Sequence, residues 1–176
     1  MEDARTHAHY VRISLNPLTL PSHPLNHSSV SISISRLPQR YGKAFSLNSY
    51  FFCHDPAVMT AVFDGIRNGG EYVAAVGAGG KFAVSGVRDL GAANYDSSTP
   101  DKLPTLPNSA SSFMVTLSFA NGTVVTVRGS GTEPKLKYYS EMVGPNASAE
   151  ELRELVDAVI AELLKPEERG LIAAKG

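Results

Sequence analysis

Residues 113–142 read FMVTLSFANGTVVTVRGSGTEPKLKYYSEM, and this stretch decides the fold. Apolar and polar side chains alternate from Phe113 to Phe119, which is the period of a strand with one buried face. Asn121-Gly122 follows and is the strongest short signal for a hairpin, because both residues tolerate a positive φ. Residues 123–127 then form the returning strand, and residues 136–142 form another. The stretch predicts a hairpin followed by a further strand.

The register of this hairpin is left open by the sequence. A two-residue turn would place Phe119 beside Val124 and Leu117 beside Thr126, so that an apolar side chain lies beside a hydroxyl. The two faces are therefore not cleanly separated under that pairing.

A helix is predicted on the N-terminal side of these strands, from Asp55 onward. Asp55 is a favourable N-cap and Pro56 suits the first helical position. Apolar residues follow at helical spacing, and Asn68-Gly69-Gly70 ends the helix. Further strands are expected in residues 45–53, 72–76 and 81–90, the last two around the glycine turn of residues 77–80. Residues 91–112 are polar and proline-bearing and predict a long loop.

A second helix is predicted at the C-terminal side. Ser148 and Glu151 form a capping box, in which the hydroxyl and the carboxylate each satisfy an amide at the helix start. Apolar residues then fall on one face until Lys165-Pro166 ends the helix. Several strands and two amphipathic helices predict an α+β domain, with the helices on one face of a mostly antiparallel sheet.

The composition of the 176 residues predicts a soluble globular protein. Hydrophobic residues make up 43% and charged residues 19%, and the formal net charge is −1. This charge does not favour nucleic acid or an anionic membrane as a partner, and no run approaches the length of a membrane span. Cys53 is the single cysteine, so no internal disulfide forms and a cytoplasmic location is expected.

The chain changes texture near Leu37. Residues 1–36 carry four of the five histidines and three closely spaced prolines. Their histidine spacing does not follow a zinc-site pattern and no cysteine lies nearby. We expect residues 1–36 to be a flexible or non-homologous extension and residues 37–176 to be the folded domain.

The segment between two of the predicted strands, Arg128 to Lys135, carries the chemistry. A phosphate site needs many donors in one small volume. The glycines at 129 and 131 let the backbone bend so that successive amides point inward, and the guanidinium of Arg128 can hold two phosphate oxygens. Hydroxyl donors come from Ser130 and Thr132. Lys135 and Lys137 lie two apart on the next strand and share one face.

The alternative interpretation of this segment is a tight loop with ordinary surface charges. Elsewhere in the chain, Arg88-Asp89 is expected to be an ion pair or part of a site rim. His54, beside the Asp55 cap, is expected to be a structural histidine rather than a general base.

The segment Arg128–Lys135 resembles the phosphate-binding loop of the last domain of the α-D-phosphohexomutase superfamily. The likeness covers about residues 37–172 and points to the branch of phosphopentomutase, phosphoglucomutase-2 and glucose-1,6-bisphosphate synthase. It rests on residues 41–42, 48–56, 87–90, 95–98, 118–122, 135–139 and 170–172 as well as on the loop.

The resemblance implies a TATA-binding-protein-like fold and a role in holding the substrate phosphate that is not transferred. It assigns phosphate binding to Arg128, Gly129, Ser130, Gly131, Thr132 and Lys137, with Glu133 and Lys135 at the rim of the site. The implied parent moves phosphate between the C1 and C5 or C6 positions of glucose, ribose or deoxyribose phosphates. It uses Mg²⁺ and a sugar bisphosphate and has three further domains.

The family's other loops are not found in this sequence: no phosphoserine loop, no aspartate-rich metal loop and no sugar-reading glutamate-serine loop. Phosphoryl transfer needs a phosphate carrier, a metal ion and a positioned acceptor. We therefore expect no catalytic residue, no metal ligand and no mutase activity in this chain alone. The alternative hypothesis is a stand-alone, non-catalytic module that binds phosphate esters and serves regulation.

Overall fold

The computed structural model describes residues 42–174, so the predicted extension at residues 1–36 lies outside the described residues. The chain forms one mostly antiparallel sheet with two long helices. The strands are β1 (Lys43–Ser46), β2 (Ser49–Phe52), β3 (Ala75–Val76), β4 (Phe82–Asp89), β5 (Tyr95–Asp96), β6 (Met114–Phe119), β7 (Thr123–Gly129), β8 (Lys135–Gly144) and β9 (Ile172–Ala173). The helices are α2 (Pro56–Arg67), α3 (Ala149–Val159), its π-helical continuation η4 (Ile160–Leu164) and α4 (Pro166–Arg169), with short 3₁₀ turns η2 (Asn68–Gly70) and η3 (Ala78–Gly80).

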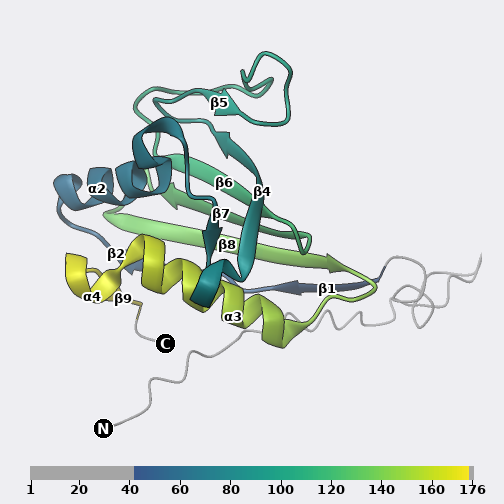
Figure 1. Ribbon diagram of the computed structural model, residues 1–176. Coiled ribbons are helices and arrows are strands. Elements are labelled where there is room, and N and C mark those ends of the chain that lie inside the picture. Colours follow the sequence, from purple (N-terminus) through teal and green to yellow (C-terminus); the bar gives the residue numbers. More distant parts are fainter. Residues whose placement is uncertain (1–41, 175–176) are drawn as a thin grey trace, which may run out of the picture.

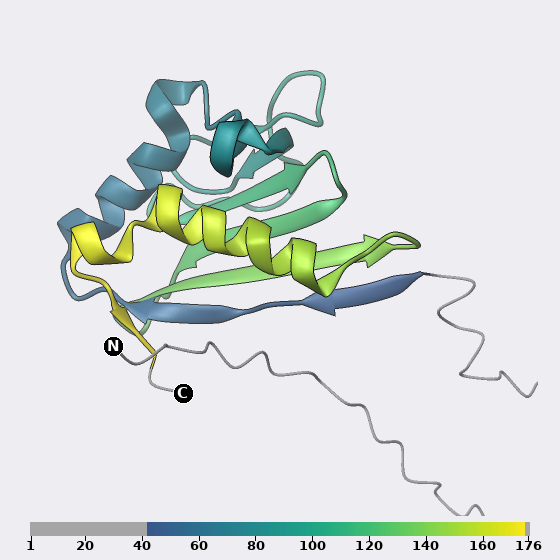
Figure 2. The same ribbon diagram turned by 60° about the horizontal axis from the view of Figure 1, so that its bottom comes forward.

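The sheet has the order β3-β4-β6-β7-β8-β2-β9, with β1 also on β8 and β5 also on β4. Every strand pair is antiparallel. Both long helices lie on the same side of the sheet, as the two views in Figures 1 and 2 show. The predicted α+β class, with helices covering one face, is confirmed.

The buried face of the sheet is apolar because alternate residues of each strand point toward the helices. On β6 these are Val115, Leu117 and Phe119, and on β8 they include Leu136 and Met142, all at most 3% exposed. The helices contribute Val62, Phe63, Ile66, Leu152, Leu155, Val156 and Leu164 to the same cluster. The other face, which we call the open face, leaves Val124, Tyr139 and Val143 exposed.

The β6–β7 hairpin differs from the two-residue-turn pairing. Ser118 pairs with Val124 and Leu117 pairs with Val125, so the turn is one residue longer. Gly122 adopts φ of 85°, the left-handed conformation that a three-residue turn requires. A shift of one residue reverses every side chain, and this register puts Leu117 and Val125 together in the core.

Both predicted helix starts are confirmed, although the second cap is only half formed. The Asp55 carboxylate accepts the Ala57 amide at 2.8 Å, and Asn68 ends α2 in the left-handed conformation. The Ser148 hydroxyl accepts the Glu151 amide at 3.4 Å. The Glu151 carboxylate instead accepts the side-chain amide of Asn121 from the hairpin turn at 2.8 Å, which ties α3 to the sheet rather than completing the box.

Two local predictions need correction. The single strand expected over residues 45–53 is interrupted between β1 and β2, where the Asn48 side chain accepts the amide of Ser140 at 2.9 Å. The long polar loop contains the short strand β5, which pairs with β4. The helix end predicted at Lys165-Pro166 is confirmed, since Lys165 is in the left-handed conformation there, and α4 and β9 follow it.

Candidate functional site

Residues 130–134 connect β7 to β8 and are closed at their base by backbone hydrogen bonds. The Gly129 amide donates to the Phe113 carbonyl and the Ser130 amide to the Lys135 carbonyl, both at 2.9 Å. The Cys53 amide donates to the Pro134 carbonyl at 2.7 Å. Because Cys53 lies just before the Asp55 cap, the loop is fixed to the start of α2.

The tip of this loop carries unused donors. Within residues 42–174, the amides of Gly131, Thr132 and Glu133 donate to no protein group, and neither do the hydroxyls of Ser130 and Thr132. Gly131, Thr132 and Glu133 are exposed. Successive amides without a protein acceptor, with hydroxyls nearby, are the kind of donors that an anion site uses.

The two loop glycines do not provide this geometry through a left-handed backbone, since neither has a positive φ. Gly129 has a packing role instead. A Cβ at this position would lie 3.2 Å from the Cβ of Phe113 and 3.5 Å from the sulfur of Met59. The missing side chain therefore lets the end of β7 approach β6 and α2 closely. A Cβ at Gly131 would meet nothing within 4 Å.

Arg128 lies on the open face at the end of β7, where it pairs directly with Lys137 of β8. Arg128 is exposed and has no carboxylate partner among the described residues. Cross-strand partners project from the same face at about 5 Å between Cβ atoms. The strand pairing thus brings Arg128 and Lys137 together beside the loop.

Lys135 is held more tightly than the sequence suggested. Its ammonium lies 2.7 Å from the Glu133 carboxylate, 4.5 Å from the ring centre of Tyr50 and 5.4 Å from that of Phe52. Its side chain is only 18% exposed. Lys137 lies 3.7 Å from the same carboxylate and is 29% exposed.

The ion pair between Glu133 and Lys135 favours the charged form of both side chains. The hydrogen bond from Lys135 lowers the pKa of Glu133, and the same bond raises the pKa of Lys135. Both groups are therefore charged at neutral pH. The loop region presents Arg128 and two lysines against one carboxylate, which is a locally cationic surface on a chain of net charge −1.

Sequence reasoning missed the aromatic support of Lys135. Tyr50 and Phe52 come from β2, which pairs with β8 so that Tyr50 is opposite Lys137 and Phe52 opposite Lys135. The alternation of Tyr50 and Phe52 was a signal for the shared face, but the strand pairing was needed to bring them under a lysine. His54 stacks on Phe52 with ring centres 6.1 Å apart and extends this aromatic surface.

Arg88 and Asp89 do not pair with each other, because neighbouring strand residues point to opposite faces. Arg88 lies on the open face and donates to Asp96 at 2.6 Å. Asp89 points inward and accepts from Arg67 at 2.7 Å. The expected ion pair is thus two separate ion pairs.

Neither a group of metal-binding side chains nor a membrane-spanning helix is found in residues 42–174. No group of three or more histidine, cysteine, aspartate or glutamate side chains is placed to hold a metal ion. None of the helices in that range is long and apolar enough to cross a membrane.

Comparison with known proteins identifies the domain. A family model described as "Phosphoglucomutase/phosphomannomutase, C-terminal domain" matches residues 110–160, which include β6, β7, the loop and β8.

Similar longer proteins extend the match toward the N-terminal side. Glucose 1,6-bisphosphate synthase of Homo sapiens is 43% identical over 140 residues, covering 76% of this chain and 22% of the relative. Phosphopentomutase of Homo sapiens is 40% identical over 149 residues, covering 81% and 24%. A probable phosphoribomutase of Schizosaccharomyces pombe is 35% identical over 150 residues, covering 84% and 25%.

The chain spans about a quarter or less of the length of these relatives. The family model, the relatives and the helix-covered antiparallel sheet agree with one another. The chain belongs to the α-D-phosphohexomutase superfamily, of which it contains the C-terminal domain.

Proposed function

We propose that the loop of residues 130–134, with Arg128 and Lys137, binds the phosphate group of a sugar phosphate. The observation that supports this most strongly is the coincidence of unused donors and cations at one end of the sheet. The loop itself carries three unused amides and two unused hydroxyls, and the exposed guanidinium of Arg128 lies next to it in the chain. A phosphate dianion can accept from all three kinds of donor, whereas a neutral ligand would leave Arg128 unmatched.

The proposed parent activity follows from the relatives, which are named as sugar-phosphate mutases and a sugar-bisphosphate synthase. We place residues 37–176 as the C-terminal domain of a phosphoglucomutase or phosphopentomutase in the cytoplasm. Three other domains of the parent would supply the phosphoserine, the Mg²⁺ site and the sugar-reading loop. A sugar bisphosphate would serve as the activating cofactor.

In that setting the loop acts as a clamp on the phosphate that is not transferred. Binding energy at a remote group can position the reacting phosphate. A single clamp without the other domains should bind weakly, with Kd near about 1 mM, or about −4 kcal/mol. With such an affinity, the loop would release the phosphate once the other domains have dissociated from the sugar phosphate.

The test is a titration of the purified chain with inorganic phosphate and with ribose 5-phosphate, followed by NMR shifts of the loop amides. Arg128→Ala should weaken binding by about tenfold or more, since a hydrogen bond to a charged group is worth about 1.5–3 kcal/mol. Arg153→Ala on α3 removes the same charge away from the loop and should leave the affinity unchanged. Equal phosphate affinities for the Arg128→Ala variant and the unmodified chain would reject the proposal.

The purified chain should bind but not turn over. An assay for interconversion of glucose 1-phosphate and glucose 6-phosphate, with Mg²⁺ and glucose 1,6-bisphosphate added, should give the rate of a blank. A rate above the blank would show that this chain contains the transferring group itself.

A further inference from the structure

Glu133 is an anion placed inside the proposed phosphate site. It lies between the loop tip and β8, where its two carboxylate oxygens face two different lysines. One oxygen lies 2.7 Å from the Lys135 ammonium and the other 3.7 Å from that of Lys137. A bound phosphate would need cations at the same place, so ligand and carboxylate compete for them.

The two lysines are not equivalent partners. Lys135 forms a hydrogen bond with Glu133, lies over Tyr50 and Phe52, and is 18% exposed. Moving it would break all of these interactions together. The Lys137 ammonium has the 3.7 Å contact with Glu133 as its one ion pair within the described residues, and the side chain is 29% exposed. Lys137 is therefore the cation that a ligand can take from Glu133 at little cost.

Lys137 is also the cation next to Arg128. The two residues are direct cross-strand partners on the open face, whereas Lys135 pairs with Phe52 on β2. If Lys137 leaves Glu133, it can join the exposed guanidinium of Arg128 on one anion. Lys135 stays with Glu133 and keeps the carboxylate from moving into the ligand's place.

We propose that Glu133 is an internal competitor for the phosphate: it occupies Lys137 in the ligand-free chain, is displaced from it by the ligand, and thereby limits affinity. This inference rests on the proposed phosphate binding and adds to it a residue that sets its strength. Lys135 has a positioning role as the partner that retains Glu133 after displacement.

The experiment compares Glu133→Gln with the unmodified chain, using inorganic phosphate as the probe at low ionic strength. Removing the competing charge should tighten binding by about three- to tenfold, the range expected for one nearby partly exposed charge. The gain should shrink in high salt because exposed charges are screened. Glu133→Ala provides a second variant, and the amide spectra show whether each variant keeps the fold.

Glu141→Gln is the matched control. Glu141 is on the same strand and on the open face, where it pairs with Val124 away from the loop. Glu141→Gln makes the same change in net charge as Glu133→Gln. Because the change is away from the loop and screened by salt, it should alter the phosphate affinity by less than about twofold. An equal gain from Glu141→Gln would assign the effect to net charge and overturn the inference.

Lys137→Met tests the route of the effect. In this variant Glu133 has no loose lysine to occupy, so adding Glu133→Gln should give clearly less gain than in the unmodified chain. A full gain would contradict competition for Lys137. Unchanged or weaker phosphate binding by Glu133→Gln, with binding still lost in Arg128→Ala, would reject the inference alone; no binding by any variant would reject the proposed function and the inference together.

Discussion

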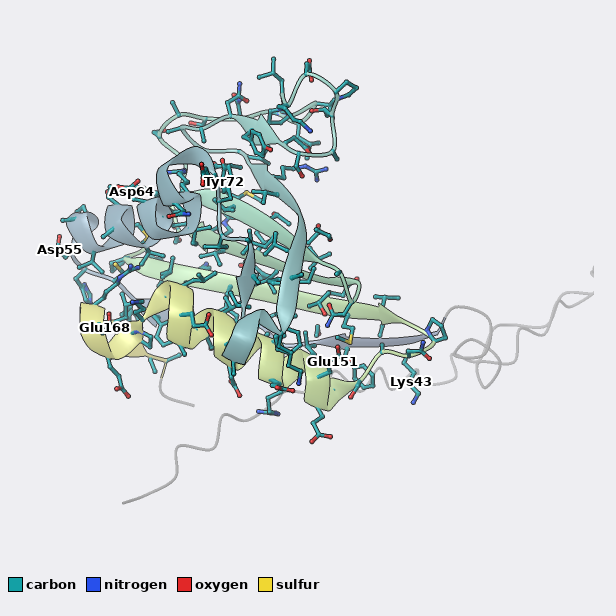
Figure 3. All side chains as sticks on the ribbon, in the orientation of Figure 1. Lys43, Asp55, Asp64, Tyr72, Glu151 and Glu168 are labelled. Atoms are coloured by element: carbon teal, nitrogen blue, oxygen red, sulfur yellow. The ribbon has the colours of Figure 1, made fainter. Side chains whose placement is uncertain are left out.

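Two groups of charged residues lie at opposite ends of α2, and they differ in exposure. At the C-terminal end, fully buried Asp89 accepts from Arg67, from the hydroxyl of Tyr72 at 3.2 Å and from the amide of Gly91 at 2.8 Å. At the N-terminal end, Glu133 holds Lys135 and Lys137 at a partly exposed surface. Figure 3 shows Asp55 and Tyr72 marking these two ends.

The difference separates charges that maintain the fold from charges that remain available to a ligand. A buried carboxylate must have all its hydrogen bonds satisfied within the protein, and the Asp89 carboxylate accepts four hydrogen bonds. The hydrogen bond with Asp89 raises the pKa of Arg67, and burial raises the pKa of Tyr72. Glu133 and Lys137 are partly exposed and lie 3.7 Å apart, so this pair can exchange partners at a lower cost than the buried pair.

Asp89→Ala is the change that should break the comparison most strongly. It leaves the guanidinium of Arg67 and the hydroxyl of Tyr72 without their partner in a buried place, which should cost about 3–5 kcal/mol of unfolding free energy. Urea denaturation measures the loss. Asp64→Ala is the control, because Asp64 lies 3.9 Å from the same arginine but is 66% exposed, and it should cost under about 0.5 kcal/mol. Similar losses in both variants would show that burial does not decide the contribution.

Asp96→Asn tests a pair of intermediate character, since the Asp96 side chain is buried and Arg88 is 42% exposed. Hydrogen bonds from Ser98 and then from Arg88 lower the pKa of Asp96 to about 2. A lowered pKa means that the stabilisation is complete above the unfolded-state pKa, near about 4. It is lost as the pH falls toward about 2.

Thermal unfolding between neutral and acidic pH would reveal this dependence. The Asn variant should be less stable at neutral pH by about 1–2 kcal/mol, and its stability should fall less steeply in acid than that of the unmodified chain. Parallel curves for the two proteins would rule out a charged Asp96 as the source of the acid sensitivity.

Lys135→Met should affect stability less than Asp89→Ala or Asp96→Asn, by about 1 kcal/mol or less, because a partly exposed ion pair and two aromatic contacts contribute little each. Lys81→Met is its counterpart, since the Lys81–Glu154 pair is 2.6 Å long with both side chains about half exposed. We expect Lys81→Met to cost still less. A loss in Lys135→Met as large as that in Asp89→Ala would place the loop lysine in the fold-maintaining class.

The sequence predicted the fold where the signals are local. The Asp55 cap, the Asn68 stop and the Ser148 start each depend on residues a few positions apart, and the structure contains all three. The hairpin register was left open, because it depends on how the turn accommodates Gly122 and on which face finds the core. β9 has only two residues, too few for a periodic pattern.

The grouping of the residues of the proposed site was predictable for a different reason. Arg128, Ser130, Thr132 and Lys137 are close in sequence and flank one loop, so chain connectivity alone brings them together. Their partners are distant: Phe113 and Met59 behind Gly129, and Tyr50 beside Lys135. These contacts arise from strand order and helix packing, which single-sequence patterns do not encode. The same applies to Arg67, which meets Asp89 across 22 positions.

The bond from the Cys53 amide to the Pro134 carbonyl gives the chain a reporter of its own. Cys53 is the single cysteine in the sequence and is 7% exposed, and burial raises the pKa of its thiol. A thiol reagent can therefore react only when the junction between β2, the loop and α2 opens. The rate of modification therefore reports those openings without an introduced cysteine, and a ligand that holds the junction closed would slow the reaction.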